Sequence, residues 1–368
     1  MNKKEGTAFA SGYVIGTLKV LFLLALIVGT VWIIKNQRDT PYQHDRGMIF
    51  GTIYEITYQH ADNLQAGLEA ELLKVDSALS MFNKQSVITR INNGEQQIPD
   101  NETGKMFLDV YQLAMQVSAD TDGAFDITVA PLVNAWGFGF KSDTMPSATQ
   151  VDSLRQFVGY KKITLNPPPS TLHPQPSTLH PQPSTLHKQD PRIMLDCSAI
   201  AKGYGCDVVA RYLEQQGVTN YMVMIGGEIV TRGINPKRLP WRIGVTKPTD
   251  DSLNLNEETQ TVLNVTDKAM ATSGNYRRFY YKNGRKYAHT IDPKTGYPVQ
   301  HSLLSATVLA KDCATADAYA TSFMVMGMER AKQLLARHNE LMAYFIYTDE
   351  KGELAVWYSP TLEDKIEN

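Results

Sequence analysis

The sequence predicts an α+β protein with a mixed β-sheet core and packed helices, preceded by one transmembrane helix at the N-terminus. Three observations lead to this prediction. An apolar run covers residues 13–34, amphipathic helical patterns recur after it, and strand-like runs alternate with them toward the C-terminus. With 368 residues, the chain is long enough to bury a large core.

The N-terminal apolar run fits a membrane anchor. It follows a tail at residues 1–12 and is interrupted only by Lys19, which lies near its start and can snorkel to the interface. A spanning helix needs about 20 apolar residues. The alternative is a cleaved signal peptide, but residues 35–38 read Lys-Asn-Gln-Arg and offer no small-residue cleavage pattern. We therefore favour an uncleaved anchor at 13–34, followed by a polar linker at 35–47.

Residues 48–368 form one predicted domain. An alternating run at 51–58 predicts its first strand, and the apolar spacing at 62–79 and 104–118 predicts two helices that pack on a sheet. Further helices are predicted at 202–216 and 314–335, and further strands at 221–225, 242–245, 303–309 and 343–347. Helices and strands of this kind make a mixed sheet with packed helices.

A low-complexity insertion at residues 167–190 interrupts this domain. A Pro-Ser-Thr-Leu-His-Pro-Gln repeat occurs there, and proline at that density blocks helices and central strands. We expect an exposed, polyproline-like or disordered loop, joining strands at 162–165 and 192–195 as an enlarged hairpin connection. Its histidines, His173, His180 and His187, are seven residues apart and so do not share a face of a three-residue helix, which argues against a metal tract.

Composition excludes some classes of function. The chain is 43% apolar and 20% charged, and its formal net charge of -2 lacks the basic excess that nucleic-acid binding usually needs. The three cysteines, Cys197, Cys206 and Cys313, are too few and too scattered for a disulfide framework or a zinc site. We interpret them as small buried residues, and an oxidised pair of Cys197 and Cys206 stays open.

Two glycine-containing segments allow the backbone to approach a ligand closely. In residues 195–207 a strand ends at Asp196, small residues follow, and Lys202 opens a helix, an arrangement that suits an anion. The alternative is a tight strand-to-helix turn with a surface lysine. The Gly-Gly pair at 226–227 either lies against a flat ligand or forms a plain hairpin turn.

Aromatic residues and a histidine provide further candidates. The segment 122–139 combines Asp126 with aromatic side chains, on which a flavin or adenine ring could rest, although core packing explains aromatics more often. An Asn-Gly pair at 283–284 predicts a two-residue hairpin, and a turn signature follows His289. A histidine at a strand end suits a general base. The alternative is a histidine that caps its own turn.

A helix opening contributes two oxygen ligands. Asp317 and Thr321 are four residues apart and therefore lie on one helix face. A carboxylate and a hydroxyl are hard ligands, which Mg²⁺ takes when phosphate and water complete its octahedron. The alternative is an acidic first turn that complements the helix dipole, with a threonine bonded back to its own helix.

Taken in order, these segments resemble the ApbE family, the FAD:protein FMN transferases. The resemblance covers nearly everything from Phe50 to the C-terminus except the insertion. It is carried by Asp-Gly-x-Phe-Asp at 122–126, Ala-Lys-Gly-Tyr at 201–204, Gly-Gly-Glu at 226–228, Thr-Ser-Gly-x-Tyr at 272–276, His-x-Ile-Asp-Pro at 289–293 and Ala-Asp-Ala-x-Ala-Thr at 316–321.

The resemblance implies the site residues. FAD would contact Ala124, Phe125, Asp126, Asp196, Lys202 and Thr290, with Phe82 near the ring system, and Mg²⁺ would be bound by Asp317, Thr321 and the carbonyl of Ala199. Two positions depart from the family pattern: Phe50 stands where methionine is usual before Gly-Thr, and Gln85 where an acid is common after Phe82. Both departures concern the flavin contacts and leave the metal ligands intact.

The implied reaction is Mg²⁺-dependent transfer of FMN from FAD to a threonine or serine hydroxyl of an acceptor protein, with release of AMP and His289 as the base. The alternatives are an FAD pyrophosphatase that gives free FMN and AMP, a non-catalytic FAD-binding protein, and an anchor or scaffold built around the proline-rich loop. By resemblance, the acceptor would be a subunit of a membrane redox pump or another flavinylated electron carrier. The expected location is the bacterial inner membrane, with the catalytic domain on the periplasmic side.

Overall fold

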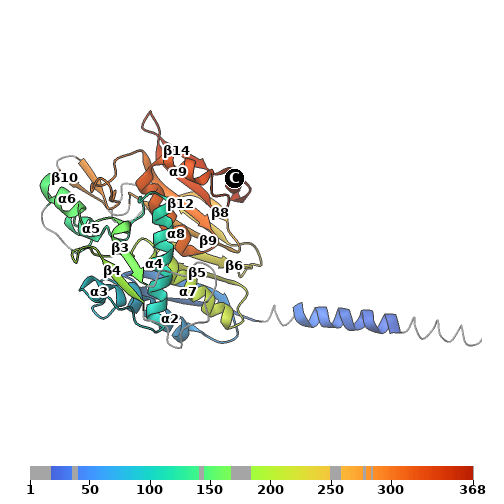
Figure 1. Ribbon diagram of the computed structural model, residues 1–368. Coiled ribbons are helices and arrows are strands. Elements are labelled where there is room, and N and C mark those ends of the chain that lie inside the picture. The colour runs from blue at the N-terminus through green and yellow to red at the C-terminus, as the bar shows by residue number, and fades with distance from the viewer. Residues whose placement is uncertain are drawn as a thin grey trace, which may run out of the picture. The chain divides into compact units, whose positions relative to one another are not determined.

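The protein is described here by a computed structural model that covers residues 18–34, 40–140, 145–166, 184–248, 258–276, 279–282 and 285–367. The chain divides into two compact units. The first comprises Met1–Gln43 and Gln59–Asn63, and the second comprises His44–Tyr58 and Leu64–Asn368. The second unit contains the sheets and helices on which the candidate site is built (Figure 1).

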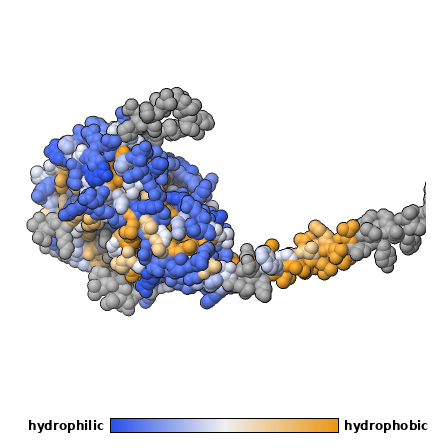
Figure 2. Space-filling view, turned by 90° about the horizontal axis from the view of Figure 1, so that it is seen from below, coloured by the Kyte–Doolittle hydropathy of each residue, from blue (hydrophilic) through white to orange (hydrophobic). Residues whose placement is uncertain are grey.

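In the first unit, residues 18–34 form a helix whose surface is apolar, as the orange colour in Figure 2 shows. In the described part of the chain, no helix is both long and apolar enough to cross a membrane. The predicted transmembrane helix is thus not found there, and residues 13–17 of the predicted span lie outside the described residues. The predicted linker at 35–47 is also corrected, because its end belongs to strand β1 (Tyr42–Ile49).

Strand β1 escaped detection because its sequence is polar. It lies at the edge of the main sheet, where one side of a strand needs no apolar neighbours. Within it the buried residue is an acid, Asp45, whose Oδ2 accepts a hydrogen bond of 2.8 Å from the hydroxyl of Tyr58. A polar pair therefore replaces the apolar alternation by which strands are recognised.

The main sheet has the strand order β1-β2-β5-β6-β9-β12-β13-β14. Its further strands are β2 (Thr52–Gln59), β5 (Tyr221–Ile225), β6 (Glu228–Arg232), β9 (Lys268–Gly274), β12 (Leu303–Ala310), β13 (Met342–Thr348) and β14 (Leu354–Tyr358). Every pairing from β2 to β14 is antiparallel. The α+β class is confirmed, but the mixed sheet was wrong. Short turns such as the one between β5 and β6 can join only antiparallel neighbours.

Both faces of this sheet are covered. Helices α7 (Ala201–Gln215) and α8 (Cys313–Met326) lie on one face, and α2 (Gln65–Leu79) and α4 (Glu102–Asp120) pack against them (Figure 1). On the other face, a smaller sheet of β7 (Arg242–Thr246), β8 (Thr259–Asn264) and β15 (Ile366–Glu367) closes a second apolar core. Strand β12 is consequently buried on both sides, with Val308 in the first core and Leu309 in the second.

Shorter elements complete the second unit. They are α3 (Val87–Asn92), α5 (Ala130–Ala135), α6 (Ala148–Arg155), α9 (Met328–Leu335), β3 (Ile163–Asn166), β4 (Thr185–Lys188), β10 (Phe279–Lys282), β11 (Arg285–Ala288) and 3-10 turns at Tyr160–Lys162 and Pro360–Lys365. The single helix predicted at 314–335 is two helices, α8 and α9. Gly327 separates them with a φ of 73° and a ψ of 175°, a conformation outside the helical region that glycine adopts without strain.

The insertion does connect two paired strands, but its second strand was misplaced. Strand β3 pairs antiparallel with β4, which lies inside the predicted insertion, and not with 192–195. Leu186 of β4 is buried in the main core, and Lys188 Nζ donates to the carbonyls of Ile91 at 3.1 Å and Ile193 at 3.0 Å. These contacts recruit the last repeat into the fold. Residues 167–183, which hold His173 and His180, lie outside the described residues.

Replacing residues 167–184 by Asn-Gly is expected to leave the fold and the site intact. Asn166 pairs with Thr185, so a two-residue turn can close the hairpin at that point. A shorter connection costs less closure entropy, and we expect stability to rise by about 1–2 kcal/mol. Chemical denaturation and FAD turnover of the shortened protein measure both effects. A loss of turnover with a retained fold would show that the insertion takes part in function.

Candidate active site

Three charged side chains meet at the start of α7. Lys202 Nζ lies 2.6 Å from Glu228 Oε1 and 3.9 Å from Asp317 Oδ1. Glu228 opens β6 and Asp317 lies in α8, so the cluster joins a strand and two helices. Both acids are deeply buried, with 3% of Glu228 and 4% of Asp317 exposed. With two carboxylates and one ammonium, this acid–lysine cluster favours an additional cation.

Burial and mutual attraction determine the charges of the cluster. Burial raises the pKa of the Glu228 and Asp317 carboxyl groups, and the Lys202 ammonium partly opposes this. Burial alone would lower the pKa of Lys202, but the two carboxylates outweigh it and raise that pKa. Among the described residues, Glu228 Oε2 is buried without a hydrogen-bond partner. A buried carboxylate oxygen in that state is costly, which again fits a cation-binding site.

Gly203 brings α7 and α8 close enough to build this cluster. Its backbone N–H donates to Asp317 Oδ2 at 3.1 Å. A Cβ at this position would lie 2.3 Å from the carbonyl oxygen of Cys313 and 2.9 Å from Cα of Ala314. Only glycine permits that approach, so the Ala-Lys-Gly-Tyr motif has a packing reason as well as a chemical one.

A buried acid of α7 holds the beginning of α8. The Asp207 carboxylate accepts hydrogen bonds from the backbone N–H groups of Cys313 at 2.8 Å and Ala314 at 2.9 Å. Asp312 caps the same helix and accepts from Thr315 N at 2.9 Å. These bonds satisfy N–H groups that a helix leaves open at its N-terminus. They therefore position Asp317, one turn further along α8.

We expect the Asp207→Asn variant to lose part of the pH dependence of stability. Burial raises the pKa of Asp207 to about 7, so the folded protein binds this proton more tightly than the unfolded chain does. Its contribution is then complete below about pH 4 and is lost as the pH rises to 7, with a slope of at most about 1.4 kcal/mol per pH unit. Urea denaturation of both proteins from pH 4 to 8 measures the difference. Parallel curves would contradict the assignment.

The turn between β1 and β2 reaches the start of α7. Phe50 adopts a φ of 52° there. A Cβ on Gly205 would lie 2.8 Å from the Phe50 ring, and a Cβ on Gly226 would lie 2.9 Å from Thr52 and 3.3 Å from Lys202 Cδ. The structure thus brings Phe50 and the Gly-Gly turn beside the acid–lysine cluster. The absence of a side chain at Gly226 leaves room for the stem of Lys202, and its absence at Gly205 leaves room for the Phe50 ring.

Asp126 accepts three hydrogen bonds from its own segment and from Tyr160. Its Oδ1 accepts from the backbone N–H of Thr128 at 2.8 Å and from its hydroxyl at 2.6 Å, while Oδ2 accepts from Tyr160 N at 2.7 Å. Burial raises its pKa and these bonds oppose the rise. Ala124 and Phe125 next to it are buried, and Phe125 belongs to the main core. Their contact with FAD stays a prediction.

Asp196 lies beside that segment. Its backbone N–H donates to Ile127 O at 2.7 Å, and its Oδ1 accepts from Ser198 N at 2.8 Å. Burial raises the pKa of Asp196, and the Ser198 bonds oppose the rise. The structure therefore brings the Asp126 and Asp196 segments together. From Asp196 the chain continues through the turn of Ala199 into Lys202.

His289 follows the hairpin of β10 and β11, as predicted. Lys282 pairs with Arg285, so two residues join the strands, and these two lie outside the described residues. His289 is half-buried, and its ring lies edge-on to Phe138 with centroids 6.4 Å apart. The buried Thr290 hydroxyl donates to Asn275 Oδ1 at 2.7 Å. This bond ties the segment of His289 to the end of β9.

The proposed metal ligands come from two elements. Asp317 and Thr321 share a face of α8, and Ala199 lies in the turn that precedes α7. In the described residues, no three or more His, Cys, Asp or Glu residues gather as a metal site. A metal at Asp317 would therefore depend on the Thr321 hydroxyl and the Ala199 carbonyl as well. All are hard oxygen donors, which suits Mg²⁺.

Phe82 is the most exposed of the predicted site residues. Its side chain is 72% exposed and contacts Phe140 edge-on at 5.3 Å. Phe140 follows the aromatic segment that carries Phe138, the neighbour of His289. An exposed ring in this place is available to a flavin, but the structure does not bring it into the buried cluster.

Sequence reasoning missed the roles of Glu228, Asp207 and Asn275. Glu228 closes the Gly-Gly-Glu motif, Asn275 lies within Thr-Ser-Gly-x-Tyr, and Asp207 follows Lys202 by five residues. Their presence in the motif segments was the available signal. Each acts through a partner that is distant in the sequence, which no local pattern reveals. All three cysteines are free and buried, so the oxidised pair of Cys197 and Cys206 is not formed.

The fold and the acid–lysine cluster define a class: an α+β protein with a buried ionic site between two helices and a glycine turn. The ApbE family model matches residues 50–345, and the chain belongs to the ApbE family. The FAD:protein FMN transferase of Vibrio cholerae is 36% identical over 324 residues, covering 86% of this chain and 90% of that protein. Its counterpart in Escherichia coli K12 is 34% identical over 321 residues, covering 85% and 86%.

A solved structure agrees with this assignment. The flavin transferase ApbE from Vibrio cholerae matches with a TM-score of 0.74 and 34% sequence identity, covering 89% of this chain and 99% of that one. The similarity in fold therefore extends over nearly all of the known structure.

Proposed function

We propose that this protein is an FAD:protein FMN transferase that uses Mg²⁺, releases AMP and modifies a threonine or serine hydroxyl. The relatives from Escherichia coli K12 and Vibrio cholerae are named FAD:protein FMN transferase, and this chain spans most of their length. The observation that carries the proposal is the buried cluster of Lys202, Glu228 and Asp317 beside two glycine-containing turns. This cluster combines the positive charge of Lys202 with the acid Asp317, which suits a divalent cation.

Lys202 and the turn before α7 would bind the diphosphate of FAD. The ammonium stays charged because both neighbouring acids raise its pKa. The backbone N–H groups at a helix N-terminus add partial positive charge in the same place. Asp196 and Asp126, which lie on adjacent segments, would contact the rest of FAD, together with Ala124, Phe125, Phe50 and Phe82. Thr290 would add a hydroxyl contact from the segment of His289.

Magnesium would be held by Asp317, Thr321 and the Ala199 carbonyl. When bound, it would neutralise charge on the diphosphate and on the leaving AMP. Burial raises the pKa of both carboxyl groups in the cluster, and a bound cation would stabilise their charged form.

His289 would act as the base. It would accept the proton of the acceptor hydroxyl as that oxygen forms a bond to the FMN phosphorus. The bond from this phosphorus to the bridging oxygen of the diphosphate breaks, and the electron pair leaves with AMP. The acceptor thus gains FMN as a phosphoester, and no oxidant or reductant is needed. Asp292 Oδ1 accepts a hydrogen bond from Lys294 N at 2.9 Å in its own turn.

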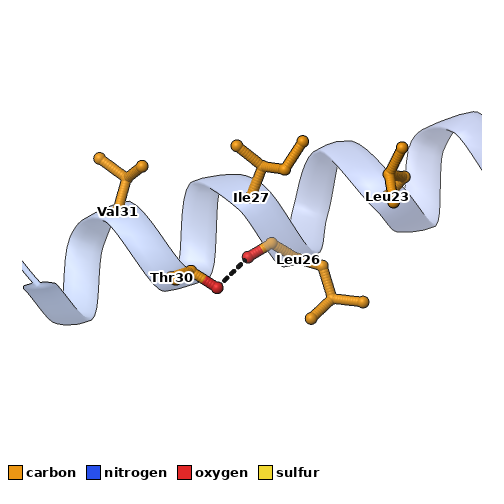
Figure 3. A pocket seen from close by; sticks show the side chains of 5 residues that line it. All are labelled: Leu23, Leu26, Ile27, Thr30 and Val31. Atoms are coloured by element: carbon orange, nitrogen blue, oxygen red, sulfur yellow. Dashed lines mark hydrogen bonds between the residues drawn. The ribbon is translucent and has the colours of Figure 1, made fainter.

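We further propose a membrane anchor at the N-terminus and a periplasmic catalytic domain at the bacterial inner membrane. The helix at 18–34 exposes large apolar side chains, among them Phe22 and Trp32. Leu23, Ile27 and Val31 follow one another along the helix beside a shallow recess, and the Thr30 hydroxyl donates to the carbonyl of Leu26 at 2.7 Å (Figure 3). An internally bonded hydroxyl is compatible with lipid. The acceptor would be a membrane redox subunit or another flavinylated electron carrier.

Incubation of the full-length protein with FAD, Mg²⁺ and a candidate acceptor tests the function. We expect AMP in solution and flavin fluorescence on the acceptor after denaturing electrophoresis, both dependent on Mg²⁺. Free FMN and AMP without labelled acceptor would indicate a pyrophosphatase. Bound FAD without AMP release would indicate a non-catalytic flavin-binding protein and contradict the proposal.

A further inference from the structure

We infer that Glu228 is a positioning residue, which holds the Lys202 ammonium away from Asp317 and so keeps the Asp317 carboxylate open to a divalent cation. This inference rests on the proposed function, because it concerns the metal site of that reaction. It assigns a role to the acid of the Gly-Gly-Glu motif that the reaction scheme above does not use.

The distances show which acid the lysine prefers. Lys202 Nζ lies 2.6 Å from Glu228 Oε1, a direct ion pair, and 3.9 Å from Asp317 Oδ1, beyond hydrogen-bond reach. Both acids are almost completely buried, so solvent screens neither attraction strongly. The lysine is thus drawn to Glu228 although a second carboxylate is close by.

The backbone of Glu228 is held on two sides. It pairs with Ile225 across the turn between β5 and β6, and its carbonyl accepts from Cys206 Sγ of α7 at 3.3 Å. The neighbouring Gly226 confines the stem of the lysine, since a Cβ there would lie 3.3 Å from Lys202 Cδ. The backbone that carries Glu228 and the stem of Lys202 are therefore both restrained near the point where the two charges meet.

Asp317 has one oxygen engaged and one facing the lysine. Its Oδ2 accepts from Gly203 N at 3.1 Å, while Oδ1 is the atom 3.9 Å from Lys202 Nζ. Without the charge of Glu228, the ammonium would move toward Oδ1 and form a direct pair with it. A cation would then have to displace that ammonium before it could bind Asp317.

A double-mutant cycle of Glu228→Gln and Lys202→Met tests this role by metal binding rather than by activity. Mn²⁺ takes the same hard oxygen ligands as Mg²⁺, and its free form is measured by electron paramagnetic resonance. In the full-length protein, we expect Glu228→Gln to weaken Mn²⁺ binding by about ten-fold, which corresponds to about 1.4 kcal/mol of lost interaction. In the Lys202→Met background, the same change should alter binding by less than about two-fold, because no ammonium remains to compete.

Glu214→Gln is the matched control. Glu214 lies on α7, the helix that carries Lys202, and pairs with Arg232 and the Tyr221 hydroxyl, so its change removes an equal charge outside the cluster. It should leave Mn²⁺ binding unaltered.

The remaining outcomes separate this inference from the proposed function. If the unaltered protein binds Mn²⁺ and Glu228→Gln binds it equally well, the positioning role is wrong while the metal site stands. An equal loss in both lysine backgrounds would mean that Glu228 acts on the metal directly, which also contradicts the inference. If the unaltered protein binds no Mn²⁺, the metal site and the inference both fail. Should Glu228→Gln not fold, the double variant Glu228→Gln/Lys202→Met is measured instead, because it loses one charge of each sign and keeps the net charge. Retained Mn²⁺ binding in it supports the role, and lost binding overturns it.

Discussion

The Asp317→Asn variant is expected to release AMP from FAD about a thousand-fold more slowly than the unaltered protein, since a catalytic metal contributes several kcal/mol to transition-state stabilisation. The amide keeps the shape of the carboxylate, and its oxygen can still accept the bond that Gly203 N donates to Asp317 Oδ2. The fold should therefore persist while the charge that is proposed to bind Mg²⁺ is lost. Chromatographic measurement of AMP over a range of Mg²⁺ concentrations gives the rate.

Asp312→Asn provides the control for this prediction. Asp312 caps the same helix, and asparagine is an equally good N-cap residue, so the control removes one acid next to α8 without disturbing the start of the helix. We expect near-normal rates from it. Full Mg²⁺-dependent activity in Asp317→Asn would rule out this acid as the metal ligand.

The His289→Gln variant is expected to lose transfer of FMN to the acceptor by about 10²–10⁴-fold, the usual contribution of a general base. FAD binding should be retained, because the Thr290 hydroxyl and Asn275 keep the segment in place. Release of AMP in the absence of acceptor should fall less than transfer does, if water can enter the site unaided. Rates of acceptor labelling and of AMP release, measured side by side, show the split.

His44→Gln is the matched histidine control, because His44 is exposed on β1 and bonds to the Thr57 hydroxyl at 2.9 Å. It should leave both rates unchanged. Acceptor labelling at the normal rate in His289→Gln would exclude His289 as the base.

Regular elements with strong local patterns were predictable from the sequence. Strand β5 has the predicted bounds, and α7 differs from its prediction by one residue at each end. Both follow from periodicity that neighbouring residues carry by themselves. Strands β1 and β4 were not predictable, because the sequence of β1 is polar and that of β4 is flanked by prolines. They become strands by pairing with Thr52–Gln59 and Ile163–Asn166. Pairing partners of this kind override weak local preference.

By itself, the sequence determined the α+β class, the family and the segments that contain the candidate site, because spacing and motif order are local properties of the chain. Only the tertiary structure decided which of these residues work together. Lys202 meets Glu228 and Asp317 because β6 and α8 pack beside the start of α7, and Gly203 allows that approach. Buried charges become strongly coupled through this packing, and the energy of that coupling depends on distance in space, which the order of residues does not specify.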